Sequence, residues 1–423
     1  MSTSPLDSFK ISPPLLNSSN PWATTEADLS ALYSCPYTGA VTIRTSLWSG
    51  FSQHPSTHQY TFFSSSLGHA TTDIDTSGAE GRGAVRELEG NSLNTLGYSP
   101  IPFETYIAML VRMNDAGILN NPTPKPFIVS VTGTADEVGL CYTFMAKTLH
   151  ERKAGGLQLM MEINLSCPNI PDKPPPAYDS KSLVESSEIP KLRRELQDGA
   201  MLANPQNRRY INAIGKAKSL VESDGYPPLH VGIKTPPYTY PGQFRALIEA
   251  LEASETLDSC PISFITATNT LGSCLVLRED GKPALGSANG EGIGGMAGEA
   301  IHALSLGNVK TIRTMLNASK HAEIRKIAII GIGGIIIIGT ATDDKEFLSV
   351  TRKEQPISEP TTIPYPYISS QLKTSSELLE TADIEQLTPQ ASTNQSSTMS
   401  ALNDFAAAHQ ADHTPRSPSH CCR

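Results

Sequence analysis

Short apolar runs rich in β-branched residues recur through the first 340 positions of this 423-residue chain, and they constrain its fold more than any other feature. Continuous runs of this kind are typical of strands buried on both faces, which belong to parallel sheets covered by helices. Eight such runs are predicted as strands, and they span residues 14–18, 39–45, 126–132, 157–164, 229–235, 263–269, 326–331 and 335–340.

Helical stretches separate most of these strands, because apolar residues recur three or four positions apart. The predicted helices span residues 25–32, 103–115, 136–151, 243–253 and 299–319. Eight strands alternating with helices predict an α/β fold of the (β/α)8 TIM-barrel type.

Several predicted strands end on a polar residue. Turn chemistry alone explains any single one of them, but active sites of barrels lie at the carboxyl ends of the strands. The joint placement therefore favours a site at that end, formed by Asn17, Arg44, Asn164, Lys234 and Asn269.

The composition divides the chain into two parts. A hydrophobic content of 39% is enough for a large core, and one barrel-sized domain with a tail fits this length as well as two ordinary domains. From residue 341 onward Ser, Thr, Pro and Gln dominate, a composition typical of disorder. We therefore expect a barrel over residues 1–340 and a disordered, low-complexity tail over residues 341–423.

Charge and cysteine usage limit the classes of function. A formal net charge of -9 argues against nucleic acid or an anionic membrane as the main partner and favours a small molecule. The seven cysteines show no spacing typical of zinc ligands, so no metal site is predicted. No signal peptide is visible and the most apolar stretch, residues 327–339, is short for a membrane span, so we expect a soluble, cytoplasmic protein.

The most informative motif follows the fourth predicted strand and reads Asn164-Leu165-Ser166-Cys167-Pro168-Asn169. A cysteine in a loop beyond a strand end is accessible, whereas a structural cysteine is normally buried. The two flanking asparagines supply both donors and acceptors, which suits a planar ligand that carries alternating carbonyl and N–H groups.

This motif, with the Pro-rich stretch and the Ala177-Tyr178-Asp179 that follow, resembles the base loop of class 1, cysteine-base dihydroorotate dehydrogenases. The resemblance implies that Cys167 is the general base, which takes a proton from ring carbon C5 of dihydroorotate while hydride leaves C6 for the flavin. It also implies that the loop acts as a lid that excludes water.

Further matches to the family follow in order along residues 14–340, and they include residues 17–20, 92–98, 232–238 and 268–270. The substrate-binding residues that the resemblance implies are Asn94, Thr95, Leu96, Gly97, Tyr98, Asn164, Asn169, Asn269 and Thr270. Lysine at position 234 corresponds to one that touches the flavin, where a cation stabilises negative charge on the reduced ring. The implied residues for the cofactor FMN are Ser19, Asn20, Arg44, Thr45, Asn164, Lys234, Thr268, Gly295, Gly333, Gly334, Gly339 and Thr340.

Two glycine clusters, at residues 292–295 and 331–334, lack the full spacing of a dinucleotide-binding fingerprint. In a barrel, glycines after strands seven and eight let backbone N–H groups bind a phosphate. FMN is therefore the preferred ligand.

The sequence departs from the family pattern in three places. Arg44 stands where the family has a lysine, and its planar fork is not equivalent to an ammonium group. Residues 179–230 are longer than the family needs, and we interpret the polar piece at 197–209 as a surface insertion. Residue 335 follows Gly334 without the helix of about a dozen residues that parallel strands need. The barrel is therefore expected to be incomplete at strands seven and eight.

The leading functional hypothesis is FMN-dependent oxidation of (S)-dihydroorotate to orotate in pyrimidine biosynthesis. The resemblance implies fumarate as the electron acceptor and a homodimer. One alternative is an FMN barrel reductase that acts on another uracil-like ring, consistent with Arg44. Another is a catalytically inactive paralogue or truncated product, consistent with the missing helix.

Overall fold

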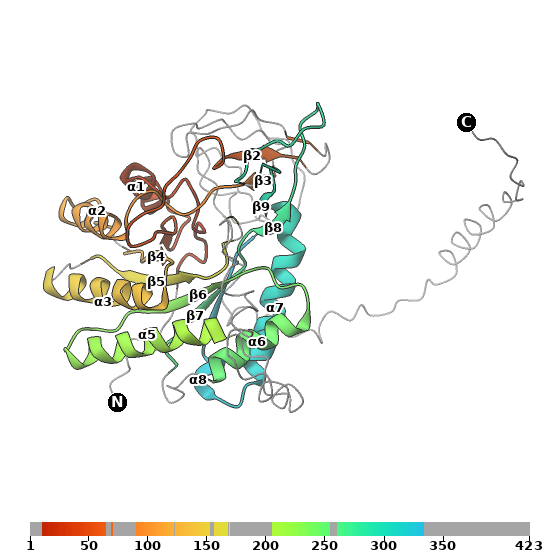
Figure 1. The fold of residues 1–423 in the computed structure, drawn as a ribbon. Helices are drawn as coiled ribbons and strands as arrows, with labels where there is room; N and C mark the ends of the chain where they lie inside the picture. The colour runs from red at the N-terminus through yellow and green to blue at the C-terminus, as the bar shows by residue number, and fades with distance from the viewer. Residues whose placement is uncertain are drawn as a thin grey trace, which may run out of the picture. The chain divides into compact units, whose positions relative to one another are not determined.

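The computed structural model describes residues 11–64, 69–70, 90–121, 123–152, 156–167, 169, 205–253, 260–288 and 290–333. Within these residues, a parallel sheet surrounded by helices forms the body of the fold, and a second, antiparallel sheet lies beside one end of it (Figure 1).

The parallel sheet follows the order of the chain. Its strands are β1 (Val41–Thr42), β4 (Phe127–Val131), β5 (Leu159–Asn164), β6 (Val231–Thr235), β7 (Phe264–Ala267) and β10 (Ala328–Gly331), each hydrogen-bonded to the next. Leu16 forms a parallel bridge with Ala40, immediately before β1. Seven successive positions of a (β/α) barrel are thus occupied, which confirms the predicted fold class.

The last predicted strand, residues 335–340, and the expected boundary at residue 340 lie outside the described residues. The seventh predicted strand takes its usual place, because β10 pairs in parallel with β7 along its whole length.

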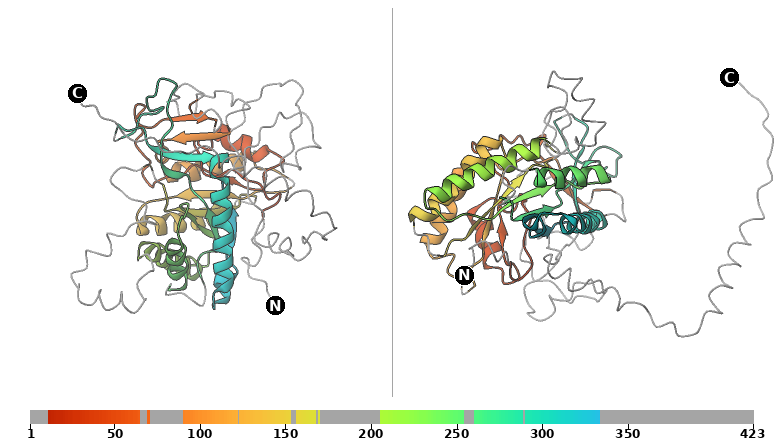
Figure 2. Two further views of the ribbon diagram at one scale, coloured as in Figure 1. Left: turned by 90° about the vertical axis from the view of Figure 1, so that its right-hand side faces the viewer. Right: turned by 90° about the horizontal axis from the view of Figure 1, so that it is seen from below.

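The helices pack against one another in the order of the strands they connect. They are α1 (Glu26–Ser34), α2 (Phe103–Asp115), α3 (Ala135–Arg152), α5 (Pro205–Ser223), α6 (Pro241–Glu252), α7 (His302–Ala318) and the short α8 (Ala322–Arg325). Contacts join α1 to α2, α3 to α5, α5 to α6 and α6 to α7, and from below α3, α5, α6 and α7 form an arc beside the strands (Figure 2). None of the helices in the described part of the chain is both long and apolar enough to cross a membrane.

Most helices match the sequence prediction within a few residues, and α2 matches it at both ends. The helix expected at 299–319 begins three residues late, because residues 299–301 form a 3-10 turn, η2 (Glu299–Ile301). The interpretation of residues 197–209 as an insertion was wrong for its last five residues. They begin α5, the crossover helix between β5 and β6, which buries Ile211, Ile214 and Val221 on one side.

The second sheet was not predicted. It consists of β2 (Tyr60–Phe63), β3 (Asn91–Asn94), β9 (Gly294–Gly298) and β8 (Leu271–Cys274), in that spatial order and antiparallel throughout. Its strand β8 begins four residues after β7 ends. The sheet therefore lies at the carboxyl ends of the barrel strands, where it is seen above the parallel sheet in Figure 1 and in the left view of Figure 2.

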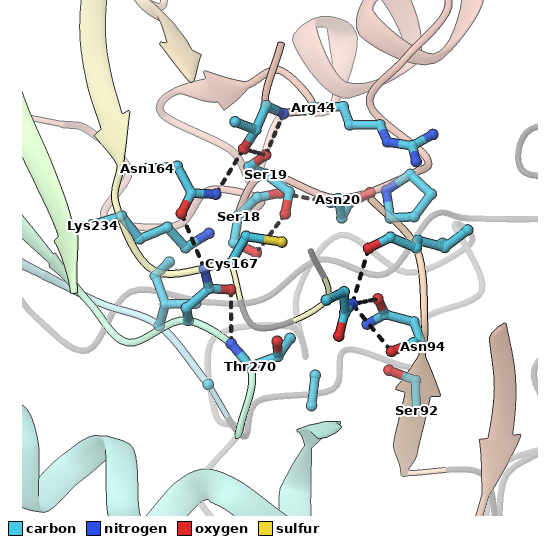
Figure 3. A pocket seen from close by; sticks show the side chains of 18 of the residues that line it. Ser18, Ser19, Asn20, Arg44, Ser92, Asn94, Asn164, Cys167, Lys234 and Thr270 are labelled. Atoms are coloured by element: carbon cyan, nitrogen blue, oxygen red, sulfur yellow. Dashed lines mark hydrogen bonds between the residues drawn. The ribbon is translucent and has the colours of Figure 1, made fainter. Parts of the chain in front are cut away.

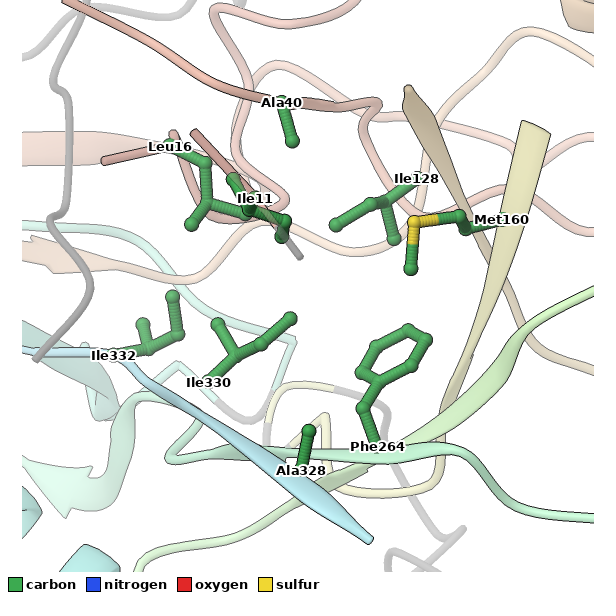
Figure 4. Close-up of a cluster of buried hydrophobic side chains, with 9 residues drawn as sticks. All are labelled: Ile11, Leu16, Ala40, Ile128, Met160, Phe264, Ala328, Ile330 and Ile332. Carbon is green, nitrogen blue, oxygen red and sulfur yellow. The ribbon is translucent and has the colours of Figure 1, made fainter. Parts of the chain in front are cut away.

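An apolar cluster fills part of the inside of the barrel. Side chains of β4, β5, β7 and β10 meet there with residues that flank the strands (Figure 4), and the cluster comprises Ile11, Leu16, Ala40, Ile128, Met160, Phe264, Ala328, Ile330 and Ile332. At the β6 position the chain has Gly232, whose place inside the barrel is taken by the ring of Phe264. Because strand side chains alternate between faces, Ser130, Glu162 and Asn164 continue the same inward rows toward the second sheet.

The contact between β6 and β7 gives a test of this packing. A Cβ atom at Gly232 would lie 2.1 Å from a ring carbon of the fully buried Phe264. We expect Gly232→Ala to lower the free energy of unfolding by about 1–3 kcal/mol, as overpacking does, measured by urea titration.

The control is Gly307→Ala in α7, where an added Cβ meets no atom within 4 Å. There alanine should be neutral or stabilise by up to about 1 kcal/mol, because glycine is unfavourable inside a helix. A Gly232→Ala variant as stable as the wild type would contradict the described packing.

Candidate active site

A cavity opens at the carboxyl ends of the parallel strands, under the second sheet (Figure 3). Its wall includes residues from β5 and β6 and from the segments that follow Leu16, β1, β7 and β10. The wall residues are Ser18, Ser19, Asn20, Pro21, Trp22, Arg44, Thr45, Ser92, Asn94, Leu96, Gly97, Tyr98, Asn164, Cys167, Asn169, Lys234, Thr268, Asn269, Thr270, Ala297, Gly298, Ile301, Ile332 and Gly333.

Most predicted site residues lie in this wall, and a few do not. Thr95 points away from the cavity, and its hydroxyl bonds the backbone oxygens of Thr57 and Gly286. Gly295 lies within β9, paired with Asn94, and does not line the cavity. The predicted residues Gly334, Gly339 and Thr340 fall outside the described residues.

The wall also contains residues that the sequence analysis did not single out. They come from the segment after Leu16, from the second sheet and its flanks, and from the end of β10, and they are Ser18, Pro21, Trp22, Ser92, Ala297, Gly298, Ile301 and Ile332. Ser92 lies in the segment 92–98 that resembles the family, whereas Ala297 and Gly298 on β9 belong to no motif that the sequence analysis recognised.

The carboxamide of Asn164 is held from three sides. Its nitrogen donates to the Thr45 hydroxyl at 2.9 Å. Its oxygen accepts from the Ser166 N–H at 3.2 Å and from the Asn269 amide nitrogen at 3.1 Å. A backbone N–H donates and never accepts, so the Ser166 bond fixes which end of the carboxamide is oxygen.

Asn269 continues this array toward the next loop. Its nitrogen also donates to the Ser166 hydroxyl at 2.9 Å, and its oxygen accepts from the Thr270 N–H at 2.8 Å. Two carboxamides from neighbouring strand ends are thus preorganised beside Cys167, and they can present donors and acceptors to a planar ligand.

Asn169 fastens the loop after β5 to the loop after β3. Its amide nitrogen lies 2.9 Å from the Asn94 side-chain oxygen, 3.2 Å from the Asn94 backbone oxygen and 2.9 Å from the Leu96 backbone oxygen. All three partners are acceptors, so a donor is required at this position. The bonds hold Cys167, two residues earlier, against the 94–98 segment.

Two cations lie in the wall. Lys234 is 2% exposed, and no described carboxylate lies within ion-pair distance of it. Arg44 is 4% exposed, and the one hydrogen bond of its guanidinium within the described residues goes to the Gly97 oxygen at 3.2 Å. Burial lowers the pKa of Arg44 to about 10, so the group remains charged at neutral pH. Buried charges are costly unless paired, so this pair of cations favours an anionic ligand.

The thiol of Cys167 points into the cavity between Lys234 and Asn94 (Figure 3). Burial raises its pKa above the usual thiol value, and the Asn169 backbone N–H and the two cations act in the opposite direction. Burial thus favours the thiol form of Cys167, whereas the backbone N–H and the two cations favour the thiolate.

Several of the predicted FMN ligands lie close together in the cavity wall. Ser19, Thr45, Asn164 and Lys234 lie together on one side of the cavity, where Ser19 and Thr45 share a hydrogen bond of 2.9 Å. Thr268 and Gly333 lie at its β7 and β10 side. A buried cation without a described counter-ion and several hydroxyl and amide groups fit a polar, electron-accepting ring.

The fold is thus a (β/α) barrel with a cavity at the carboxyl ends of its strands, the usual place for active sites in such barrels. The family model of dihydroorotate dehydrogenase matches residues 59–349. The chain therefore belongs to the dihydroorotate dehydrogenase family.

Relatives of the chain are also named for this activity. A putative dihydroorotate dehydrogenase A (fumarate) of Streptococcus uberis is 26% identical over 58% of this chain and 59% of its own length. The dihydroorotate dehydrogenase (fumarate) of Kluyveromyces lactis is 26% identical over the same two shares. The chain thus spans about three fifths of the length of the curated relatives it matches.

Among solved structures, a crystal structure of DHODH in complex with ferulenol from Eimeria tenella matches 76% of this chain and 70% of that chain. The identity is 14% and the TM-score is 0.44, a likeness too weak to support the assignment.

The Asn169 contacts generate a prediction. In Asn169→Asp a carboxylate replaces the donor and faces three oxygen atoms, so the loop should detach from the 94–98 segment. We expect backbone hydrogen exchange in residues 94–98 and 164–167 to accelerate about tenfold or more, as measured by mass spectrometry. The reason is that the loop loses the hydrogen bonds that keep both segments ordered.

Asn121→Asp is the matched control, since the Asn121 side chain accepts a hydrogen bond from the Thr123 N–H and an aspartate can do the same. It should leave exchange in both segments unchanged. Equal exchange in Asn169→Asp and wild type would rule out the fastening role.

Proposed function

We propose that the chain oxidises (S)-dihydroorotate to orotate with FMN as the hydride acceptor. The observation that carries the proposal is the Cys167 thiol, which faces a cavity that also contains buried Lys234 and two preorganised carboxamides. When bound, FMN accepts the hydride that leaves C6 of the substrate ring.

Cys167 is the proposed general base, which takes the proton from C5 as a thiolate. Lys234 and Arg44 favour the thiolate by their charge, and the Asn169 N–H favours it by a hydrogen bond. Ser19, Thr45, Asn164 and Lys234 would hold the flavin, which would supply the hydride acceptor, while the Cys167 thiolate would take the proton.

The amides serve the ring itself. Asn164 and Asn269, with Asn94 and Asn169 opposite, surround the space beside the thiol with donors and acceptors. This distribution suits the alternating carbonyl and N–H groups of a dihydropyrimidine. Arg44 also lines the cavity and donates to the Gly97 oxygen, and its planar guanidinium suits the carboxylate of the substrate.

The remaining parts of the proposal are expectations of the sequence analysis, and of these only fumarate also stands in the names of the relatives. They are the soluble, cytoplasmic setting, the homodimer, and fumarate as the final oxidant. The division into a barrel over residues 1–340 and a tail over residues 341–423 belongs to the same proposal.

The base assignment is tested by Cys167→Ala. We expect the rate of flavin reduction by dihydroorotate at neutral pH to fall by at least about a hundredfold, the usual contribution of general base catalysis, measured by stopped-flow absorbance. Cys274→Ala is the control, because Cys274 lies on β8 and does not line the cavity. Near-normal rates in Cys167→Ala would refute the assignment.

The pH dependence of the same step has a defined sign. The base must be deprotonated, and burial raises the pKa of Cys167, so the reduction rate should rise with pH through and above neutrality. The expected slope is about tenfold per pH unit while the thiol is mostly protonated. A rate that is flat from pH 6 to 9 would contradict a thiolate base.

Arg44 supports a second candidate, reduction or oxidation of another uracil-like ring, because a guanidinium replaces the ammonium group of the family. The comparison is flavin reduction by dihydroorotate against dihydrouracil, which lacks the carboxylate. We expect dihydroorotate to react at least about a hundredfold faster if Arg44 binds that carboxylate. The reverse preference would favour the second candidate, and purified protein without flavin would favour neither.

A further inference from the structure

A chain of buried hydrogen bonds descends from the cavity wall into the barrel. It joins Asn164 to Thr45 at 2.9 Å, Thr45 to Ser130 at 2.9 Å and Ser130 to the Glu162 carboxylate at 2.8 Å. The last two residues, Ser130 and Glu162, do not line the cavity and are at most 2% exposed. They come from the inward rows of β4 and β5, directly opposite each other in register.

The carboxylate sets the direction of this chain. A carboxylate accepts hydrogen bonds and donates none, so the single proton of the Ser130 hydroxyl must point to Glu162. Ser130 is then an acceptor for Thr45, whose own proton is used in that bond. Thr45 must therefore accept from its remaining partners.

Those remaining partners occupy both acceptor positions of the Thr45 hydroxyl oxygen. A hydroxyl has one donor and two acceptor positions, and Thr45 accepts from the Asn164 nitrogen and from the Ser19 hydroxyl, each at 2.9 Å. Ser19 in turn accepts from the Thr45 N–H at 2.7 Å. With every position used, the carboxamide of Asn164 has its nitrogen toward Thr45 and its oxygen toward Asn269.

We propose that Glu162 is a positioning residue that acts through Ser130 and Thr45 to fix the orientation of the Asn164 carboxamide at the ligand site. The same orientation is favoured from the loop side by the Ser166 N–H, so the amide is held between two agreeing anchors. The inference rests on the proposed function in one respect, namely that Asn164 contacts the substrate ring.

The chain offers a matched control in Ser46. Its hydroxyl is also buried, at 1% exposure, and it has no hydrogen-bond partner in the described residues. Ser46→Ala thus removes the same atoms as Ser130→Ala without interrupting the chain of bonds. Both changes are made in the full-length, FMN-loaded protein.

Two readouts are measured. Orotate affinity, by calorimetry, should weaken about tenfold in Ser130→Ala and stay unchanged in Ser46→Ala, since one buried hydrogen bond is lost. Exchange of the Asn164 side-chain amide protons, by NMR with labelled asparagine and assigned by their loss in Asn164→Ala, should accelerate about tenfold or more in Ser130→Ala alone.

A double-mutant cycle separates positioning from a merely structural role. If Ser130 acts through Asn164, Ser130→Ala should have no further effect on orotate affinity once Asn164 is alanine. Additive losses would overturn the proposal. So would a Ser130→Ala protein that is less stable but keeps the wild-type orotate affinity and amide exchange.

Glu162→Met serves if Ser130→Ala fails to fold. It removes both the charge and the acceptor, and the apolar side chain can extend the interior cluster that already contains Met160. It should accelerate Asn164 amide exchange about tenfold or more. Unchanged exchange would overturn the proposal. If the wild type does not bind orotate, the proposed function fails, whereas the exchange measurement still decides the role of Glu162.

Discussion

The inward face of the parallel strands is the constraint on which the rest of the structure depends. Both faces of these strands are buried, so each inward side chain must be either apolar or hydrogen-bonded inside the barrel. Along β5 the inward side chains change from apolar to polar between residues 160 and 164. Met160 lies in the apolar cluster, Glu162 accepts a hydrogen bond from Ser130, and Asn164 reaches the cavity. The core and the site are thus successive layers of one interior.

This layering makes the site rigid where the chemistry needs it. The carboxamides at the strand ends bond to one another and to hydroxyls below them, while Asn169 binds the loop of Cys167 to the segment after β3. Preorganised donors and acceptors lose little entropy when a ligand binds. The thiol and the buried cations Lys234 and Arg44 then face a ligand whose place is already defined.

Family membership and the individual residues carry different kinds of information. The family model covers residues 59–349 and so extends past the boundary expected at 340. At the individual level, the structure places the guanidinium of Arg44 beside Gly97 with donors to spare. The family model thus describes the chain as a whole, whereas a planar cation in the wall bears on which ligand substituent is preferred.

The sequence by itself determined the parallel strands, the helix α2 and the presence of Arg44, Asn164, Lys234 and Asn269 at strand ends, because burial and periodicity are local properties of the chain. Only the tertiary structure decided the second sheet, whose strand β8 is partly exposed and shows no apolar alternation. It also turned Thr95 away from the cavity and joined Thr45 to Asn164 across 119 residues and to Ser130 across 85. Such bonds depend on which strands become neighbours, and no local pattern records that.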